Sequence, residues 1–491
     1  MKTGEAPELK VESVERFERD VKLRLPFRFG VITVTEATQA VVRVRIALAD
    51  GRSGAGVAAE TLAAKWFDKN LALGDDQNLD QLRQALDIAI DLYRARGTAT
   101  PFALFADTYR DQLARGAALA LNPLVASYGP ALLDRAIIDA LGRILGRSFA
   151  DMIRANVPGI AATALVPDLV GFDLARFLAS LKPGDAIDVR HTVGLVDPIV
   201  AADRPAAHRV NDGLPETLEE VARHYGGRYY KLKVGGRVDA DLDRLARIAA
   251  VLDKEAGGCR ATLDGNEQYD SVEGIAELWR RMAETPRLRR LVDSILFVEQ
   301  PIKRAVALSR PVAPLARHRP LIIDESDGDL GAFPAALKLG YAGVSSKNCK
   351  GFYKSLLNAA RVAKLNGEAG ATRYFMSAED LTTWTGVSVQ QDLALASLLG
   401  LTHVERNGHH FIDGMSFAPE SEQRSFAAAH PDLYAKGKVP ARLRIEKGRL
   451  RLGSLGCAGF AVAGEMDFAA MRPMPAAPKN AIVPADEKVP A

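Results

Sequence analysis

In the second half of the chain, short β-rich runs alternate with helical patterns, and this alternation limits the available folds more than any other feature. The helical stretches include DADLDRLARIAAVLDKEA and GFYKSLLNAARVAKLNG. Such alternation predicts parallel strands joined by right-handed crossovers. Eight repeats in about 220 residues are typical of a (β/α)8-type barrel of roughly 250 residues, whereas a doubly wound open sheet usually has fewer strands. The predicted strands are IDVRHTV (187–193), YYKLKV (229–234), RATLDGN (260–266), ILFVEQ (295–300), PLIIDE (320–325), AGVSSK (342–347), RYFMSAE (373–379) and THVER (402–406).

The first half of the chain indicates a different architecture. The segment VKLRLPFRFGVITVTEATQAVVRVRIALADGRSGAGVAAE predicts antiparallel strands, with a hairpin turn at Asp50-Gly51. Helical patterns follow from about residue 80 to 150, including ALLDRAIIDALGRILG. The stretch from Gly54 to Gly56 is too short for a nucleotide-binding fingerprint, and it ends a hairpin instead of linking a strand to a helix. We therefore predict an α+β domain over residues 1–150.

The composition argues against several classes of protein. With 64 Lys and Arg against 61 Asp and Glu in 491 residues, the net charge is +3, which argues against nucleic acid as a partner. The three cysteines lack metal-ligand spacing and fit a reducing compartment. The N-terminus lacks the apolar region of a signal peptide, and no apolar run approaches the ~20 residues of a membrane helix. We expect a soluble, cytoplasmic protein with no membrane partner, ending in a flexible Pro- and Ala-rich tail over residues 472–491.

Charged residues gather at the C-terminal ends of the predicted strands, where such barrels carry out their chemistry. Asp264, Glu299 and Asp324 follow three successive strands, each about one strand–helix unit from the next. Taken singly, such an acid is commonly a helix N-cap and a lysine after a strand a solvated charge. Their order and spacing favour one shared site at the barrel mouth. The other polar residues at these ends are Lys231, Lys233, Asn266, Lys347 and Glu379.

Three carboxylates brought together raise one another's pKa unless a cation neutralises them. Oxygen ligands fit Mg²⁺, with Mn²⁺ as the alternative, and a set without His or Cys argues against zinc. Beside such a cation a lysine has a lowered pKa and can act as a base. Because Lys231 and Lys233 share one face of their strand, we expect each to disfavour protonation of the other. Lys347, four strands round the barrel, would approach a substrate from the opposite side.

As a set, these motifs resemble the enolase superfamily, specifically its muconate lactonizing enzyme-like branch in the mandelate racemase/muconate lactonizing enzyme family. The likeness rests on KLK (231–233), LDGN (263–266), VEQP (298–301), DES (324–326) and Lys347. It extends to LPFRFG, DGRSGAGVAAET and LDRAIIDALGRILG in the first half and to EKGRLRLGSLGCAGF near the end, so most of the chain is covered.

The resemblance implies an α/β fold, a TIM-like (β/α)7β barrel with an N-terminal α+β capping domain that the C-terminal segment completes. The corresponding domains are the capping domain (1–150), a connecting insertion (151–186), the catalytic barrel (187–410), a C-terminal segment that returns to the capping domain (411–471) and the tail (472–491). The insertion is longer than the family needs, and it would contribute to an oligomer interface or reshape the pocket entrance.

The resemblance also implies roles for the charged residues. Asp264, Glu299 and Asp324 would bind Mg²⁺, which grips a substrate carboxylate and stabilises the enolate formed when the α-proton leaves. Lys233 would be the base on one face, and Lys347 would serve the other face as acid, base or stabilising cation. Lys231 would assist electrostatically. Glu379 would contact Lys347 or, equally, cap the segment DLTTW. Asn266 would support the metal ligands from behind or contact the substrate.

The ends of the last three barrel strands differ from those of other branches of the superfamily. The mandelate racemase branch carries Asp on strand six and His on strand seven, where this chain has Lys347 and no histidine. His403, Glu405, His409 and His410 are interpreted as structural residues, with substrate contact as the alternative.

Lysines on both faces predict a Mg-dependent isomerase or lyase that removes the α-proton of a small-molecule carboxylate. A racemase or epimerase is the first choice, and a cycloisomerase or dehydratase is the alternative. A non-catalytic binding or structural relative and a metal-independent aldolase with a Schiff-base lysine also stay open. We expect a homo-oligomer, and we expect specificity to reside in capping loops, through Phe27, Arg28, Phe29, Lys65 and Trp66.

Overall fold

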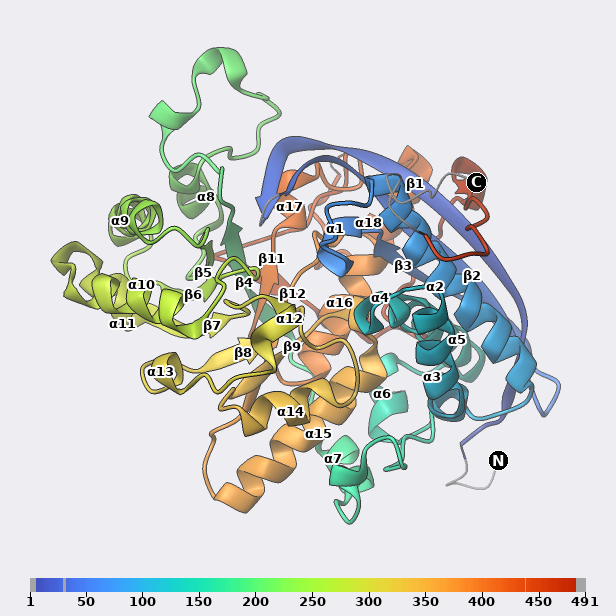
Figure 1. Ribbon diagram of the computed structural model, residues 1–491. Helices are drawn as coiled ribbons and strands as arrows, with labels where there is room; N and C mark the ends of the chain where they lie inside the picture. The colour runs from blue at the N-terminus through green and yellow to red at the C-terminus, as the bar shows by residue number, and fades with distance from the viewer. Residues whose placement is uncertain (1–5, 30–31, 438, 483–491) are drawn as a thin grey trace, which may run out of the picture.

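The protein is described here by a computed structural model that covers residues 6–29, 32–437 and 439–482, with the backbone alone for Phe29. Within these residues it contains a four-stranded antiparallel sheet and a nine-stranded sheet that closes into a barrel. In Figure 1 the antiparallel sheet and its helices, coloured blue to teal, lie beside the barrel and are called the cap below.

The cap sheet is built from β1 (Leu9–Phe29), β2 (Ile32–Leu48) and β3 (Ser53–Thr61). Towards the end of β2, buried Val42, Val44 and Ile46 alternate with exposed arginines, so one face of the sheet packs inward. The predicted turn joins β2 to β3, and its Gly51 has a φ of +87°, a left-handed conformation that favours glycine. The antiparallel arrangement predicted for this half is therefore present.

Helices cover the inner face of the cap sheet, and α5 lies against β3. A Cβ atom on Gly56 would lie 2.2 Å from the backbone nitrogen of Ala140, so only glycine allows this close approach. The short glycine stretch therefore serves helix–sheet packing. The helices of this part are α1 (Ala64–Phe67), α2 (Asp75–Arg96), α3 (Pro101–Ala118), α4 (Pro123–Ala126), α5 (Tyr128–Leu145) and α6 (Phe149–Arg154).

The barrel consists of eight parallel strands in sequence order, closed by pairing of the last strand with the first. Each predicted strand overlaps an observed one, so the predicted barrel is confirmed. The strands are β4 (Ala186–Val193), β5 (Tyr229–Lys233), β6 (Arg260–Asp264), β7 (Ile295–Glu299), β8 (Leu321–Ile323), β9 (Gly343–Ser346), β10 (Phe375–Ala378) and β11 (His403–Arg406).

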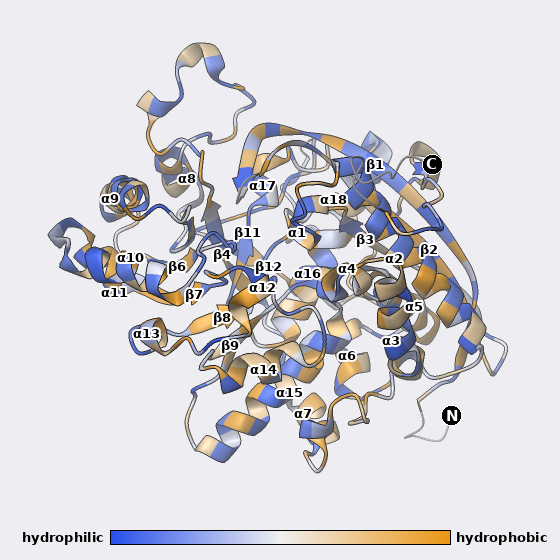
Figure 2. Ribbon diagram, viewed as in Figure 1, coloured by the Kyte–Doolittle hydropathy of each residue, from blue (hydrophilic) through white to orange (hydrophobic). Residues whose placement is uncertain are grey.

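Helices cover the outside of the barrel, and the strands are buried along most of their length because both of their faces are covered. Figure 2 shows this directly: β8 is apolar, whereas outer helices such as α10 carry both polar and apolar residues. The outer helices are α8 (Leu218–Tyr225), α9 (Val238–Glu255), α10 (Val272–Glu284), α11 (Arg289–Ser294), α12 (Arg304–Ala307), α13 (Ala313–Ala316), α14 (Ala332–Lys338), α15 (Phe352–Ala369) and α16 (Val387–Leu398).

The chain after the barrel runs back to the cap. It contains α17 (Gly408–Phe411) and α18 (Glu420–Ala429), and β12 (Arg449–Arg451) pairs antiparallel with β4. The Phe460 ring stacks on Phe149 with centroids 3.7 Å apart, and the Phe460 N–H donates to Asp139 at 2.7 Å. The last described strand, β13 (Arg472–Pro473), pairs with β1. The predicted tail therefore begins with a segment that pairs with the cap sheet, and residues 483–491 lie outside the described residues.

The connecting insertion contains a 3-10 turn (Pro167–Leu169) and α7 (Leu174–Ser180). It packs against α15, where Arg361 Nε donates to Asp168 at 2.7 Å. None of its residues lines the cavity described below. Pocket reshaping, one of the two roles predicted for it, therefore receives no support from this structure.

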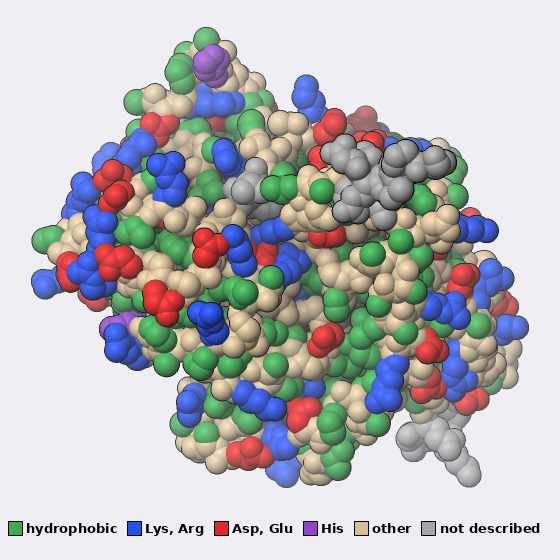
Figure 3. All heavy atoms as spheres, in the orientation of Figure 1, with side chains coloured by type: hydrophobic (Ala, Val, Ile, Leu, Met, Phe, Trp, Pro, Cys, Tyr) green, Lys and Arg blue, Asp and Glu red, His purple; other side chains and the backbone are tan. Residues whose placement is uncertain are grey.

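The visible face in Figure 3 carries both signs of charge interspersed, as the near-neutral composition leads one to expect. Among the described residues, none of the helices has the length and apolarity required to cross a membrane.

Candidate active site

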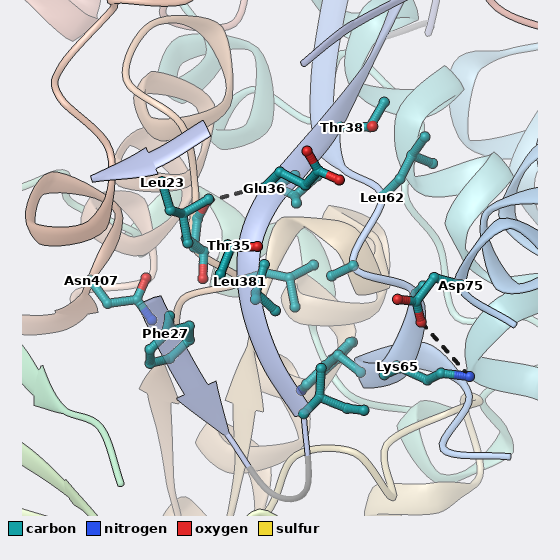
Figure 4. Close-up of a pocket in the computed structure, with 18 of the residues that line it drawn as sticks. Leu23, Phe27, Thr35, Glu36, Thr38, Leu62, Lys65, Asp75, Leu381 and Asn407 are labelled. Carbon is teal, nitrogen blue, oxygen red and sulfur yellow. Dashed lines mark hydrogen bonds and ion pairs between the residues drawn. The ribbon is translucent and has the colours of Figure 1, made fainter. Parts of the chain in front are cut away.

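A cavity of about 460 Å³ lies between the cap and the C-terminal ends of the barrel strands. The β1–β2 hairpin, residues 61–66 and the start of α2 form its outer wall. The barrel contributes Lys233, Asn266 and Lys347, together with residues after β10 and β11. Figure 4 shows this cavity, with Phe27 and Asn407 on one side and Lys65 and Asp75 on the other. The cavity therefore lies at the barrel mouth where the strand-end residues were predicted to meet.

The three acids lie at the C-terminal ends of three neighbouring strands. Asp264 ends β6 and pairs in register with Glu299 at the end of β7, and Asp324 directly follows β8. All three side chains are fully buried. Burial, followed by the nearby charges of Asp264 and Glu379, raises the pKa of Glu299 well above its usual value. The predicted position of each acid at the end of its strand is thus present in the structure.

Lys231 lies at the centre of a ring of carboxylates, with 1% of its surface exposed. Its Nζ is 2.9 Å from Asp264, 2.7 Å from Glu299, 2.8 Å from Glu379 and 2.8 Å from Glu405. Burial alone would lower the pKa of Lys231, but these four charges raise it well above its usual value. The pKa of Lys231 is therefore raised where a lowered pKa was expected, because carboxylates outnumber lysines around it.

Lys233 and Lys347 both line the cavity, on opposite sides of the barrel. Lys233 ends β5 and Lys347 directly follows β9, and these strands are four apart in a closed ring of eight. Lys233 Nζ lies 2.5 Å from Asp264, and Lys347 Nζ lies 2.6 Å from Asp324. Burial would lower the pKa of Lys347, yet Asp324 more than offsets this and raises it.

Glu379 is fully buried and contacts Lys231 and the Arg190 guanidinium rather than Lys347. The predicted capping role belongs to its neighbour, because Asp380 accepts hydrogen bonds from the N–H groups of Leu381 and Thr383 at 2.9 and 2.8 Å. Both expectations for Glu379 therefore need correction, since its side chain points into the barrel and not along the chain.

Asn266 lines the cavity and supports a neighbouring acid. Its side-chain nitrogen donates to Glu325 at 3.1 Å, and its N–H donates to Asp264 at 2.8 Å. Among the residues proposed for specificity, Phe27, Lys65 and Trp66 line the cavity. Arg28 is exposed and outside the lining, and the side chain of Phe29 lies outside the described residues.

Several site residues were either not singled out from the sequence or given another role. Lys350 is buried 3.4 Å from Asp324 and 3.0 Å from Asp327, and Asn407 lines the cavity with 2% of its surface exposed. Glu405 was interpreted as structural, but it lines the cavity and contacts Lys231. For Lys350 a signal was present, because it lies one 3-10 turn after Lys347.

The donor chemistry of Asp264, Glu299 and Asp324 fits a hard divalent cation, because it offers only carboxylate oxygen. Glu299 Oε2 is buried and accepts no hydrogen bond from the described residues, although Lys231 Nζ is close by. In the present arrangement, no three Asp, Glu, His or Cys side chains of the described chain are placed to hold a metal ion together. Each of the three acids is paired with a lysine instead, so cation binding requires these side chains to move.

The histidines after β11 lie outside the cavity. Because Arg190 and Thr192 contact Glu379 and Glu405 inside the barrel, the intervening His191 points outward. There its ring centroid lies 5.5 Å from that of His409 and 5.1 Å from that of His410. All three are buried, which agrees with the structural interpretation of His409 and His410.

This histidine cluster predicts loss of stability in mild acid. Burial lowers the pKa of His409 to about 3 and that of His191 and His410 well below the usual 6.5. Below pH 6.5 the unfolded chain takes up protons that the folded chain does not, so stability falls with falling pH. Each histidine accounts for up to about 2 kcal/mol between pH 6.5 and 5. Urea unfolding at pH 7 and pH 5 measures this, and His409→Phe should reduce the loss of stability by up to about 2 kcal/mol; an unchanged loss contradicts the prediction.

No protein-family model matches the sequence, and no curated protein matches it either. The structure, however, is similar to solved structures, and these define the class of fold. This chain has the fold of the enolase superfamily. The resemblance stated from the sequence is confirmed at this level.

Three of these structures illustrate the likeness. A dipeptide epimerase from Enterococcus faecalis, complexed with Mg and the dipeptide L-Leu-L-Tyr, is 16% identical, with a TM-score of 0.58 over 92% of this chain and 99% of its own. A muconate lactonizing enzyme from Mycobacterium smegmatis, complexed with muconolactone, is 19% identical, with a TM-score of 0.58 over 93% and 97%. An enolase from Bradyrhizobium, complexed with magnesium and mandelic acid, is 15% identical, with a TM-score of 0.57 over 94% and 97%.

Proposed function

We propose that this protein is a Mg²⁺-dependent racemase or epimerase that removes and returns the α-proton of a small carboxylic acid. The observation that supports this most strongly is the placement of Lys233 and Lys347 on opposite sides of one cavity beside buried carboxylates. A proton can be taken from one face of an α-carbon and returned to the other only if groups approach from both sides. The neighbouring folds, which include enzymes complexed with magnesium, agree with the proposal.

Asp264, Glu299 and Asp324 would hold the cation. When bound, Mg²⁺ would act as a Lewis acid towards the substrate carboxylate and would take over the acids that now pair with Lys233 and Lys347. The Nζ of one lysine then accepts the α-proton, and the Nζ of the other donates a proton to the opposite face. Lys231 holds the surrounding acids in place, and the cap forms the outer wall of the cavity.

The charges around the cavity favour a substrate without a second carboxylate. Among the described residues that line it, the basic groups are Lys65, Lys233 and Lys347, and each is already bonded. Lys65 Nζ donates to the carbonyl oxygens of Asn70 and Leu73 at 3.1 and 2.6 Å. The outer wall also carries the acids Asp20, Glu36, Asp75 and Asp76. Because a remote carboxylate would meet these acids, the distal part of the substrate should be neutral or positively charged, which favours epimerisation over cyclisation of a dicarboxylic acid.

The proposal is tested by proton NMR in D₂O with Mg²⁺ and a library of chiral carboxylic acids, including N-acyl amino acids, dipeptides and dicarboxylic acids. Exchange of the α-proton together with inversion supports the proposal. Exchange followed by loss of a β-substituent would indicate a dehydratase, and exchange confined to dicarboxylic acids would favour the cycloisomerase alternative. If no acid exchanges in the presence of bound Mg²⁺, the proposed activity is wrong.

Cation binding has its own expected result, independent of any substrate. Adding millimolar Mg²⁺ should raise the melting temperature of the wild type, because a ligand that binds only the folded state stabilises it by RT ln(1 + [L]/Kd), about 2.7 kcal/mol at 100 times Kd. Asp264→Ala should abolish the shift. Asp270→Ala is the matched control, because Asp270 is exposed and pairs with Lys303 at the surface. An equal shift in Asp264→Ala would place the cation elsewhere.

A further inference from the structure

Arg304 joins the cap to the barrel beside the candidate site. It is the first residue of α12, in the loop that follows β7. Its guanidinium donates to the carbonyl oxygens of Trp66 at 2.7 Å and Phe67 at 2.8 Å, both in α1 of the cap. Since the guanidinium is planar and carries several fixed donors, it can hold two adjacent carbonyl groups at once, which a lysine ammonium does less well.

Glu267 in turn fixes Arg304. One carboxylate oxygen accepts from the N–H and Nε of Arg304 at 2.6 and 2.8 Å, and the other accepts from its terminal nitrogen at 2.9 Å. Lys69 of the cap adds an ion pair at 2.6 Å. Glu267 is 4% exposed and has a φ of +66°, a conformation uncommon for a residue with a side chain. The turn after β6, the loop after β7 and the cap therefore meet in one charged cluster.

Trp66, whose carbonyl oxygen accepts from Arg304, packs against Lys347, one of the two cavity lysines. Lys347 Nζ lies 4.3 Å from the centroid of the Trp66 ring, well within the range of a cation–π interaction. Both side chains are almost fully buried and both line the cavity. Lys233, on the far side of the barrel, has its ion pair with Asp264 instead.

We propose that Arg304 is a positioning residue for Lys347. By fixing the main chain of Trp66, it keeps the indole ring against the ammonium group and sets how Lys347 reaches into the cavity. The proposal rests on the proposed function for its kinetic consequence, but the placement of Lys347 can be measured without any substrate. Because a displacement of about 1 Å in a reacting group can cost as much as 100-fold in rate, loosening Trp66 should weaken proton transfer on the Lys347 face alone.

Arg304→Lys is the main test, because it keeps the positive charge but loses the planar guanidinium that bonds two carbonyl groups at once. Glu267→Gln is the second variant, and Arg280→Lys is the matched control, since Arg280 is an exposed surface residue in ion pairs with Glu277 and Glu284. The first readout is reductive methylation of the folded protein, quantified at Lys347 and Lys233 by peptide mass spectrometry. The second is α-proton exchange from each enantiomer separately, the face of each lysine being assigned with Lys233→Met and Lys347→Met.

In Arg304→Lys we expect methylation of Lys347 relative to Lys233 to rise at least threefold, and exchange on the Lys347 face to fall about tenfold while the Lys233 face changes less than twofold. Glu267→Gln should change both readouts in the same direction, and Arg280→Lys should change neither. An unchanged methylation ratio in both variants overturns the proposal, as does an equal loss on both faces. If the ratio rises but the wild type exchanges no acid, Arg304 does position Lys347 and it is the proposed function that fails.

Discussion

Replacing Lys233 with methionine is expected to abolish α-proton exchange from one enantiomer of the substrate, with a fall of about 10²–10⁴-fold, the usual contribution of a general base. Replacing Lys347 should do the same for the other enantiomer. The two losses differ in face because the lysines belong to strands on opposite sides of the barrel. Exchange in D₂O, measured separately for each enantiomer, distinguishes them.

Both variants should fold, so a loss of exchange reports on chemistry. Without Lys233, Asp264 still pairs with Lys231 at 2.9 Å. Without Lys347, Asp324 keeps its contact with Lys350 at 3.4 Å and its hydrogen bond from Ser345. Lys303→Met is the matched control, because Lys303 is exposed and pairs only with Asp270 among the described residues. Loss of exchange from both enantiomers in each single variant would contradict a two-base mechanism.

The sequence predicted the parts of the site that depend on local order along the chain. Asp264, Glu299 and Asp324 follow consecutive strands, and a parallel barrel necessarily brings such residues to the same end. The alternation of strands and helices likewise predicted all eight barrel strands. These predictions needed no knowledge of how far the strands tilt or which side chains point inward.

Contacts across the barrel could not be predicted in this way. Lys231 meets Glu405 and Glu379, which lie 174 and 148 residues further along the chain. Which residues meet there depends on closure of β11 against β4 and on the inward direction of each side chain, and neither is encoded in local periodicity. The same limit applies to Arg28, since the curvature of the β1–β2 hairpin decides which of its side chains face the cavity.

The contacts that Lys231 makes across the barrel lead to the largest expected effect on stability. Lys231→Met removes the shared cation from four buried carboxylates, and breaking a buried ion pair on one side typically costs 3–5 kcal/mol. We expect the free energy of unfolding, measured by urea denaturation, to fall by about that amount. Lys233→Met should cost clearly less, because its partner Asp264 retains Lys231.

Of the four carboxylates, Glu299 should be the one most affected by the loss of Lys231. Asp264 retains Lys233, Glu379 retains Arg190, and Glu405 retains hydrogen bonds from Thr192 and Asp380. Among the described residues, Lys231 is the only cation within ion-pair distance of Glu299. A double variant, Lys231→Met with Glu299→Gln, should therefore regain part of the loss, since neighbouring sites that share one interaction are not additive. Suppose instead that the double variant loses as much free energy of unfolding as the two single variants together. The ring of carboxylates around Lys231 would then not be the source of the cost, and the position of Lys231 at the centre of the barrel mouth would need another explanation.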